Sequence, residues 1–297
     1  RIDQTFVNFA NSAENVAIDS SVVRVGVFAQ DEWRILPTLS ATLGLRYDYI
    51  TWIGNRLSPR GALIWQATPQ TTLKALYGRA HRSPNSYERD YNDAVFQVSN
   101  PGLHSETIDT AELVADHRPL PDMNLRATVY AWDMMNLITL GVDPISGISQ
   151  YQQASRKVLA RGAELSLDKT WDWGARLRSS FGIQSAEQQG SSLQNSPQYL
   201  GKLNVSIPLP LMAGLRAGFE LQYYGKRKTN DSTHTDSYFL SNLNLVTDVR
   251  WVKGLEASLS FYNLFNEHYQ HPAADTNWQN SLSQPGRTVR LRMDYRF

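Results

Sequence analysis

Long segments in which apolar and polar residues alternate constrain the fold of this chain more than any other feature. The last segment shows this with an apolar set, Val289, Leu291, Met293, Tyr295 and Phe297, and a charged set, Arg290, Arg292, Asp294 and Arg296. Successive side chains of a β-strand point to opposite faces, so this strand would have one apolar and one charged face. The pattern recurs over 39–49, 175–184 and 215–222, which predicts an all-β protein.

The length of these segments favours a membrane barrel over a soluble sandwich. They run for about 10–12 residues, which suits a tilted membrane crossing, whereas strands of soluble proteins average about 5–6. We expect short turns near 36–38, 68–70, 120–122, 172, 208–211 and 249–253, and long loops near 51–56, 81–106, 136–149, 186–197, 226–236 and 267–285. Short periplasmic turns alternating with longer external loops are typical of outer-membrane barrels.

These boundaries predict about 13 antiparallel strands. They lie at 21–33, 39–50, 57–68, 71–80, 107–118, 122–134, 150–170, 173–185, 198–208, 213–225, 237–248, 254–266 and 286–297. We interpret 1–20 as a partial strand with an external loop and 21–297 as the C-terminal strands of a barrel. Single-chain bacterial barrels have even strand numbers, and the chain starts with Arg, so we expect a truncated N-terminus.

Composition agrees with a barrel that has a wet interior. The mean hydropathy is −0.41 despite 14 Tyr, 8 Trp and 10 Phe, and aromatic residues at strand ends are typical of membrane interfaces. No apolar run reaches the roughly 18 residues of a membrane-spanning helix. The net charge of +1 gives no reason to expect a nucleic-acid partner. Cys is absent, which says little about the redox compartment.

Several motifs occur in the same order as in one known family. They are Phe28-Ala29-Gln30-Asp31-Glu32-Trp33 with Leu43-Gly44-Leu45-Arg46-Tyr47-Asp48, Leu76-Tyr77-Gly78-Arg79-Ala80-His81-Arg82-Ser83-Pro84 with Tyr87-Glu88, Asn100-Pro101-Gly102-Leu103 with Glu106, Arg161-Gly162-Ala163-Glu164-Leu165, Asn263-Leu264-Phe265-Asn266 with Tyr269, and the terminal strand from Gly286-Arg287 to Phe297. Together they resemble the β-barrel of a TonB-dependent outer-membrane receptor over nearly the whole chain.

The resemblance implies a transmembrane barrel of about 22 strands, of which this chain would supply about 13–14 as an incomplete wall. It also implies a Gram-negative outer membrane, contact with its lipid, recognition of Phe297 by the barrel assembly machinery, and coupling to the TonB–ExbB–ExbD complex. The plug domain and the short coupling motif that this family carries are absent from the sequence.

Two sets of residues are candidates for ligand contact. The 81–106 loop has Arg82, Tyr87, Glu88, Arg89, Tyr91 and Phe96. Aromatic and basic side chains together suit a catecholate-like iron chelate. The second set would line a polar lumen: Arg46, Asp48, Arg126, Glu164, Arg176, Arg178, Glu220, Arg290, Arg292, Asp294 and Arg296. Such residues also solvate a wet barrel wall without binding any ligand.

Catalytic and metal-binding motifs are missing. The sequence has no Gly-x-Ser-x-Gly, His-Glu-x-x-His or phosphate-loop pattern, so we expect no enzyme activity, no cofactor and no resident metal. Five of the six His, all but His117, fall in expected external loops, where His is common without binding metal. Residues 85–99 contain no His, which disfavours the haem receptors of the family.

The leading functional hypothesis is therefore an energised importer of a scarce large nutrient, with a ferric siderophore first. Cobalamin or another metal chelate remains open, as do a passive porin-like channel, an outer-membrane barrel enzyme and a soluble β-sandwich.

Removal of Phe297 tests the assembly signal. In the full-length protein we expect less receptor in the outer membrane, because the terminal aromatic residue on an alternating strand is what the resemblance assigns to the assembly machinery. Surface labelling of cells that express the two proteins to the same total level measures the effect, and equal surface levels would contradict it.

Overall fold

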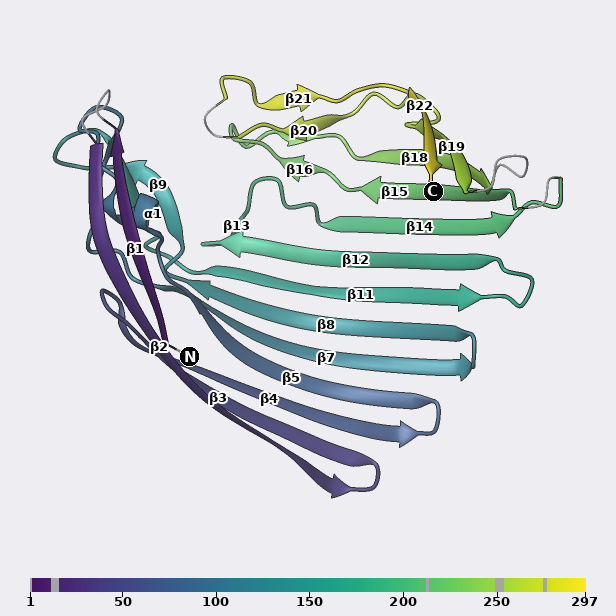
Figure 1. The fold of residues 1–297 in the computed structure, drawn as a ribbon, viewed down its shortest axis with the longest axis horizontal. Helices are drawn as coiled ribbons and strands as arrows, with labels where there is room; N and C mark the ends of the chain where they lie inside the picture. Colours follow the sequence, from purple (N-terminus) through teal and green to yellow (C-terminus); the bar gives the residue numbers. More distant parts are fainter. Residues whose placement is uncertain (1, 12–15, 212–213, 249–253, 275–276) are drawn as a thin grey trace.

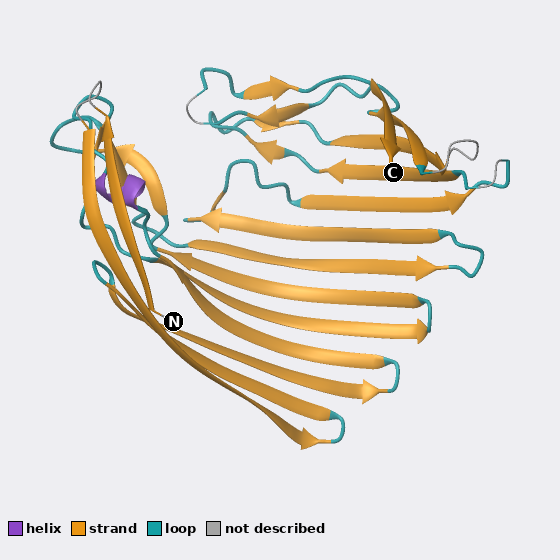
Figure 2. Ribbon diagram, viewed as in Figure 1, coloured by secondary structure: helices purple, strands orange, loops and turns teal. Residues whose placement is uncertain are grey.

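The computed structural model describes residues 2–11, 16–211, 214–248, 254–274 and 277–297, with side chains from Ser21 onward apart from Asp248. Within this part of the chain, 15 strands form one sheet, and almost all of the fold is strand (Figure 2). Along the sheet they are β1 (Ile2–Asn11), β2 (Val16–Leu36), β3 (Leu39–Ile50), β4 (Gly54–Thr68), β5 (Thr71–Arg82), β7 (Glu106–Leu120), β8 (Met123–Met135), β11 (Val158–Thr170), β12 (Arg176–Gln188), β14 (Tyr199–Pro208), β15 (Arg216–Tyr224), β18 (Tyr238–Asp248), β19 (Leu255–Tyr262) and β22 (Thr288–Tyr295), with β13 (Ser191–Ser192) beside β12.

From β1 to β22, each strand of this sheet order pairs antiparallel with the strands before and after it, which confirms the predicted antiparallel wall of about 13–14 strands. Tight turns join the strands on the right of Figure 1, and the longer connections lie on the left. Strands made of β-branched and aromatic residues, separated by Pro- and Gly-containing turns, account for this arrangement.

The register gives the sheet two different faces. Directly paired residues of an antiparallel sheet project to the same face, so one row of partners can be followed across several strands. Asp116, Arg126, Ser166, Ser180 and Lys202 form a row on the polar face. The adjacent row on the other face is Ala115, Ala127, Leu165, Phe181 and Gly201.

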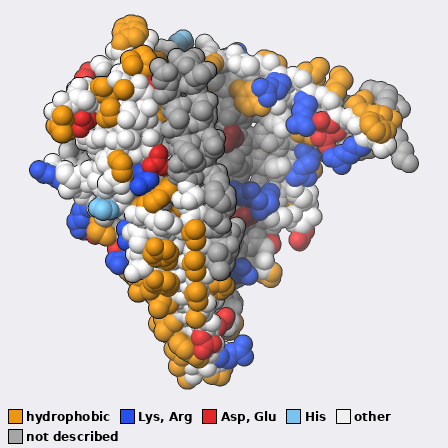
Figure 3. Space-filling view, turned by 60° about the vertical axis from the view of Figure 1, so that its left-hand side comes forward, with side chains coloured by type: hydrophobic (Ala, Val, Ile, Leu, Met, Phe, Trp, Pro, Cys, Tyr) orange, Lys and Arg blue, Asp and Glu red, His pale blue; other side chains and the backbone are white. Residues whose placement is uncertain are grey.

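The apolar face has no covering layer in the described structure. Leu113, Leu165 and Leu291 are each about 60% exposed (59%, 59% and 62%). Figure 3 shows apolar side chains in columns over the outer surface, with Lys and Arg side chains in the hollow. An apolar surface of this extent marks a contact with lipid or with another protein.

None of the described helices is both long and apolar enough to span a membrane.

The long connections carry their own small elements. The 83–105 segment contains α1 (Ser86–Asp90) and β6 (Gln97–Val98), and β6 joins β9 (Ile138–Val142) and β10 (Ser149–Gln153) in a three-stranded sheet. Two short hairpins, β16 (Arg227–Lys228) with β17 (His234–Thr235) and β20 (Gln270–Pro272) with β21 (Ser281–Ser283), extend the later loops.

Three predicted boundaries were wrong. The expected strand 150–170 is two elements, because Ala154 N donates to Leu137 O (2.6 Å) and closes the β9–β10 hairpin before β11 begins. The strand expected to reach 266 ends at Tyr262, since Asn263 and Asn266 adopt left-handed conformations (φ 49° and 57°) that no strand continues. The expected long loop at 51–56 is a turn at 51–53.

The main sheet is open, with β1 and β22 at its edges. We predicted only a partial strand within residues 1–20, with the first complete strand at 21–33. Instead, Ile2–Asn11 forms a full strand that pairs with β2 over its whole length, from Ile2 opposite Val25 to Asn11 opposite Val16.

The same substitution should cost more stability on the apolar face of β8 than on its polar face. Val129 lies mid-strand on the apolar face between Leu113 and Ala163, and Thr128 lies on the polar face opposite Glu164. In phospholipid vesicles, Val129→Arg should destabilise the protein by about 2–4 kcal/mol, the cost of an arginine near the bilayer midplane. Thr128→Arg, which gains Glu164 as a partner, should cost less than about 1 kcal/mol. Urea unfolding in vesicles measures both, and the reverse order would show that the faces are assigned wrongly.

Candidate ligand-binding face

A groove of about 790 Å³ lies on the polar face where β2–β5 meet the long connections. We call it the outer arginine groove. Its lining includes Arg24, Phe28, Arg46, Asp48, Arg56, Ser58, Arg60 and Arg82. The register places Phe28, Arg46 and Ser58 in one row across three strands, and Arg56 opposite Asp48. Neighbouring strands therefore bring together residues that are widely spaced in the sequence.

Two strand glycines make room for the arginines. A Cβ atom on Gly44 would lie 2.7 Å from Arg60 Nε and 2.9 Å from Arg60 Cγ, so the Arg60 stem lies flat across this position. A Cβ atom on Gly26 would collide with the Arg46–Asp48 pair, 2.7 Å from Asp48 Oδ1. Glycine within a strand often marks a bend of the sheet or the close approach of another backbone. At both positions the neighbour is a side chain.

The groove carries more positive than negative charge. Arg46 binds Asp48 through two short contacts, Nε–Oδ2 at 2.7 Å and Nη2–Oδ1 at 2.6 Å. Arg56 donates to Asn55 O (2.7 Å), and Arg60 donates to Gln30 Oε1. Among the described residues, no carboxylate pairs with Arg24, Arg56 or Arg60. Guanidinium groups that lack a carboxylate partner are ready to bind an anion through charge-assisted hydrogen bonds.

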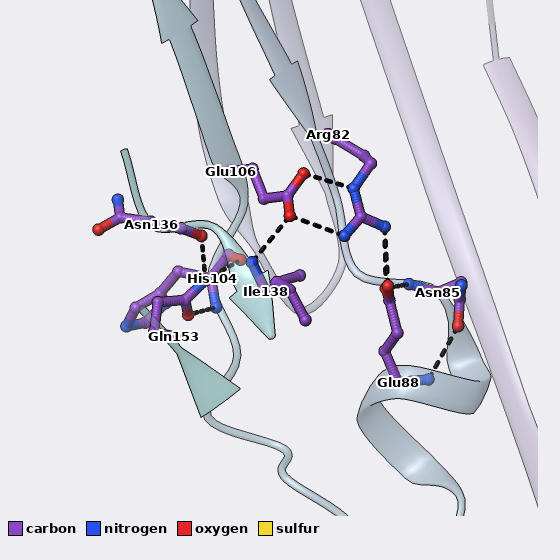
Figure 4. A network of polar contacts seen from close by, with 8 residues as sticks. All are labelled: Arg82, Asn85, Glu88, His104, Glu106, Asn136, Ile138 and Gln153. Atoms are coloured by element: carbon purple, nitrogen blue, oxygen red, sulfur yellow. Dashed lines mark hydrogen bonds and ion pairs between the residues drawn. The ribbon is translucent and has the colours of Figure 1, made fainter. Parts of the chain in front are cut away.

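Residues 83–105, which we call the strap, begin at the rim of this groove, and Arg82 anchors them. Arg82 donates to Glu106 through Nε (2.5 Å) and Nη2 (2.8 Å), and through Nη1 to Glu88 (2.9 Å). Glu88 also closes the N-terminal capping box of α1 with Asn85. Glu106 in turn accepts from Ile138 N (2.8 Å), so one ion-pair network joins the strap to the next long loop (Figure 4).

A second contact between these two loops uses Gln153. Its Nε2 donates to His104 O (3.0 Å) and to Asn136 O (2.6 Å), while its Oε1 accepts from His104 N (2.7 Å) (Figure 4). The strap and the 136–157 loop therefore form one connected external lobe.

Aromatic residues gather on this lobe. The ring centroids of Tyr87 and Tyr91 are 4.7 Å apart, and Tyr151 from β10 lies 6.1 Å from Tyr87. Arg89 is held away from solvent, with its guanidinium 4.1 Å from the Trp52 ring centroid and 2.5 Å from Asp90. Burial raises the pKa of the Asp90 carboxyl, and the Arg89 guanidinium opposes this shift. Arg89 thus docks α1 on the β3–β4 turn.

The tip of the strap is ordered by one carboxylate. Asp93 Oδ1 accepts from the backbone N–H groups of Val95 (3.0 Å), Phe96 (2.7 Å) and Gln97 (2.9 Å). These hydrogen bonds, with that to Gln97 first, lower the pKa of Asp93 to about 2, so it is ionised at any physiological pH. The turn leaves Phe96 78% exposed, away from the tyrosine cluster.

The structure separates the predicted loop residues into two roles. Arg82, Glu88 and Arg89 are held in ion pairs that shape the strap. Tyr87, Tyr91 and Phe96 offer aromatic surface instead, but Phe96 does not join the other two.

The predicted lumen residues share the polar face by register but do not form one site. Arg126 and Lys74 both bind Asp116 (2.6 and 2.7 Å), and Arg176 and Arg178 both bind Asp168 (2.7 and 3.2 Å). Glu220, which accepts from Asn242, lines one groove of about 580 Å³ together with Arg176 and Arg178. The others lie apart: Arg292 pairs with Asp294, Arg290 lies over Tyr262, and Glu164 stands opposite Thr128. Only Arg46 and Asp48 of this set line the outer arginine groove.

Sequence reasoning missed Arg24, Arg56, Arg60 and Tyr151. Arg24 lies at a polar-face position of β2, and Arg56 and Arg60 lie at polar-face positions of β4. The period-2 alternation of these strands could therefore have identified all three as polar-face residues. Tyr151 fell inside a predicted strand of the wall and could not be placed in the lobe. Phe297 lies two residues beyond Tyr295, the last residue of β22, and is fully exposed, with its ring centroid 6.1 Å from that of Tyr295.

His81 and His117 lie in wall strands and make hydrogen bonds to neighbouring strands. His81 contacts Thr107 Oγ1 and Leu57 O, and His117 contacts Thr71 Oγ1, all at 3.0 Å. Within the described ranges, no group of three or more His, Cys, Asp or Glu residues is placed to hold a metal ion.

Comparison with known proteins supports the fold assignment. The family model for the β-barrel of TonB-dependent receptor-like proteins matches residues 3–264. The chain is 26% identical over 247 residues to the ferric enterobactin receptor of Pseudomonas aeruginosa, covering 73% of this chain and 32% of that protein. It is 24% identical over 279 residues to an iron-regulated outer membrane virulence protein of Vibrio cholerae, covering 82% of this chain and 41% of that protein.

Solved structures show the same wall. A crystal structure of the Pseudomonas aeruginosa ferric enterobactin receptor superposes with a TM-score of 0.76 at 20% identity, covering 95% of this chain and 46% of the other. The siderophore receptor PirA of Acinetobacter baumannii gives a TM-score of 0.76 at 17% identity, with 94% and 46% covered. The chain thus spans 32% to 46% of the length of these relatives.

The family model matches 262 of the 297 residues, almost 90%, and the wall is antiparallel with one polar and one apolar face. The chain therefore belongs to the TonB-dependent receptors of the Gram-negative outer membrane, and its strands are part of their β-barrel.

Proposed function

We propose that the receptor containing this barrel wall takes up an anionic ferric chelate of the siderophore class, and that the outer arginine groove binds it beneath the strap. The observation that carries the proposal is the set of guanidinium groups of Arg24, Arg56 and Arg60, which have no carboxylate partner among the described residues. An electropositive groove raises the local concentration of an anion and favours it over an uncharged ligand.

The chemistry of the groove suits an aromatic chelator. Phe28 is 66% exposed among the arginines, and the tyrosine cluster lies on the neighbouring lobe. Flat aromatic rings that carry negative oxygens would stack on these side chains while the arginines bind the oxygens. The relatives named as ferric enterobactin and siderophore receptors support this class.

Energy for uptake would come from the TonB–ExbB–ExbD complex, as in the family, and would act through parts of the receptor outside this chain. A passive porin is disfavoured because the matching family model and the named relatives are receptors. An enzyme is disfavoured because the matching family model and the named relatives are receptors, and because His81 of the groove contacts Thr107 Oγ1 and Leu57 O while Ser83 contacts Ser105.

Removing arginines from the groove should weaken ligand binding. A hydrogen bond to a charged group contributes about 1.5–3 kcal/mol, so Arg56→Gln with Arg60→Gln should raise the Kd of an anionic ferric tris-catecholate by at least about tenfold, with a weaker dependence on salt. Arg161→Gln is a control, because Arg161 is exposed on the apolar-face register of β11. Fluorescence quenching of the purified full-length receptor measures the Kd. Equal affinities would place the ligand elsewhere.

Gly44→Ala tests the position of Arg60 without removing a charge. The added methyl group would displace the Arg60 stem and should weaken binding several-fold. Gly78→Ala is the matched control, since its Cβ would meet only Thr110 Oγ1 at 3.6 Å, an ordinary contact. Both changes replace a strand glycine on the polar face, so their effects on strand stability should be similar. The same titration compares the two, and identical affinities would show that the orientation of Arg60 does not matter.

A further inference from the structure

The apolar face of the wall is hollowed where the β7–β8 hairpin lies beside β5. A groove of about 480 Å³ is found there, and we call it the alanine groove. Ala75, Ala115 and Ala127 form its floor, because they have the smallest side chains of its lining. Trp65 and Leu73, which pair across β4 and β5, stand beside them. The groove is therefore a depression between larger apolar side chains on the outer surface.

A single arginine lies next to this groove on the same face. The register places Arg161 of β11 opposite Ala131, and Ala163, two residues further along β11, opposite Val129, which lines the groove. Only small side chains thus separate the guanidinium from the groove. Arg161 is exposed, and among the described residues no carboxylate pairs with it.

The acidic residues of this part of the apolar face are already engaged. Asp109 binds Arg79 through two contacts (2.7 and 2.8 Å) and also accepts from Tyr77 (2.9 Å). Asp133, directly opposite Asp109, binds Lys157 at 3.0 Å.

On the other side of Arg161, Glu187 accepts from Ser185 Oγ at 2.6 Å. The Arg161 guanidinium is thus the cation that these contacts leave available for an anion from outside the protein.

The depth of Arg161 in the bilayer indicates which anion it meets. Lys169 lies by Asp122 and by the ring of Trp171 (5.8 Å) next to a short turn, as expected of the periplasmic boundary. Arg161 lies eight residues before Lys169 on β11. Eight residues of a strand tilted by about 35–45° rise by roughly 20 Å, and the apolar band of such barrels is about 25 Å tall. Arg161 therefore reaches the headgroups of the external leaflet.

We infer that the alanine groove and Arg161 form a binding site for a phosphorylated glycolipid of the external leaflet. One of its acyl chains lies in the groove, in contact with the floor and with Leu73, while a phosphate of its headgroup accepts hydrogen bonds from Arg161. The site lies on the face opposite the outer arginine groove, so it does not depend on the proposed function.

The position of the free cation selects this lipid over a phospholipid of the periplasmic leaflet. In a Gram-negative outer membrane the external leaflet consists of phosphorylated glycolipids and the periplasmic leaflet of phospholipids. A periplasmic-leaflet lipid would present its phosphate near Lys169, which is already bound to Asp122. Arg161, at the opposite end of β11, lies on the side of the long connections, which face the exterior.

Native mass spectrometry of the purified, delipidated full-length receptor tests the headgroup contact. When purified lipid A is added, the wild type should bind one molecule with an affinity about tenfold higher than that of Arg161→Gln. Arg161→Lys, which keeps the charge but loses the bidentate geometry, should restore part of the affinity. Arg126→Gln is the matched control, because Arg126 lies on the polar face and should leave lipid binding unchanged.

Filling the groove tests the acyl-chain contact without changing any charge. Ala127→Leu places a larger side chain on the floor and should lower the affinity for lipid A several-fold. Ala217→Leu is the matched control, because Ala217 lies on the apolar face of β15 between Ile207 and Leu245, away from the groove. Both alanines face lipid, so thermal unfolding in detergent without lipid A should be the same for the two variants and the wild type.

Three outcomes would overturn the inference. Equal binding of lipid A by the wild type and Arg161→Gln would remove the arginine from the site, and full binding by Ala127→Leu would remove the groove. Phosphatidylglycerol that binds as tightly as lipid A, or inorganic phosphate that displaces lipid A, would show that the site does not select a glycolipid. Failure of the proposed function is distinguishable, since it concerns the Kd of the ferric chelate, which Arg161→Gln should leave unchanged.

Discussion

The pairing of every strand with its neighbours through backbone hydrogen bonds is the constraint on which the rest of this structure depends. A bilayer offers no water to unpaired N–H and C=O groups, and each such group costs several kcal/mol. Each interior strand of the path is therefore bonded on both sides, from β2 to β19. A single sheet built in this way has no interior core, so its two faces meet two different solvents, and the alternation of side chains follows from that difference.

The same single-layer geometry explains how charged groups come together. Pairs such as Lys74 and Arg126 around Asp116, or Arg176 and Arg178 around Asp168, link adjacent strands on the wet face. Where arginines outnumber acids, the surplus guanidinium groups line grooves. Gly44 and Gly26 contribute by lacking a side chain, since the Arg60 stem and the Arg46–Asp48 pair occupy the space that their Cβ atoms would need.

The external lobe is held together by side-chain contacts, whereas the wall is held together by backbone pairing. Its elements are too short to be stable alone, and ion pairs and side-chain hydrogen bonds join them. Arg82 connects the strap to Glu106 at the start of β7, while Gln153 bridges His104 and Asn136. Residues that look like ligand contacts in the sequence, such as Arg82 and Arg89, thus hold the lobe in place. The half-exposed ring of Tyr87 packs beside those of Tyr91 and Tyr151.

The sequence by itself determined the wall: period-2 alternation identified nearly every strand and its faces, turn residues located most of the short connections, and the ordered motifs identified the family. Tertiary structure alone decided that Arg24, Arg46, Arg56 and Arg60 converge, that residues 149–153 leave the wall for the lobe, and that Arg82 is neutralised by two carboxylates. The physical reason is that alternation is a local property of one strand. A groove depends on the register between strands, and a lobe depends on hydrogen-bond partners far away in the chain, neither of which local periodicity encodes.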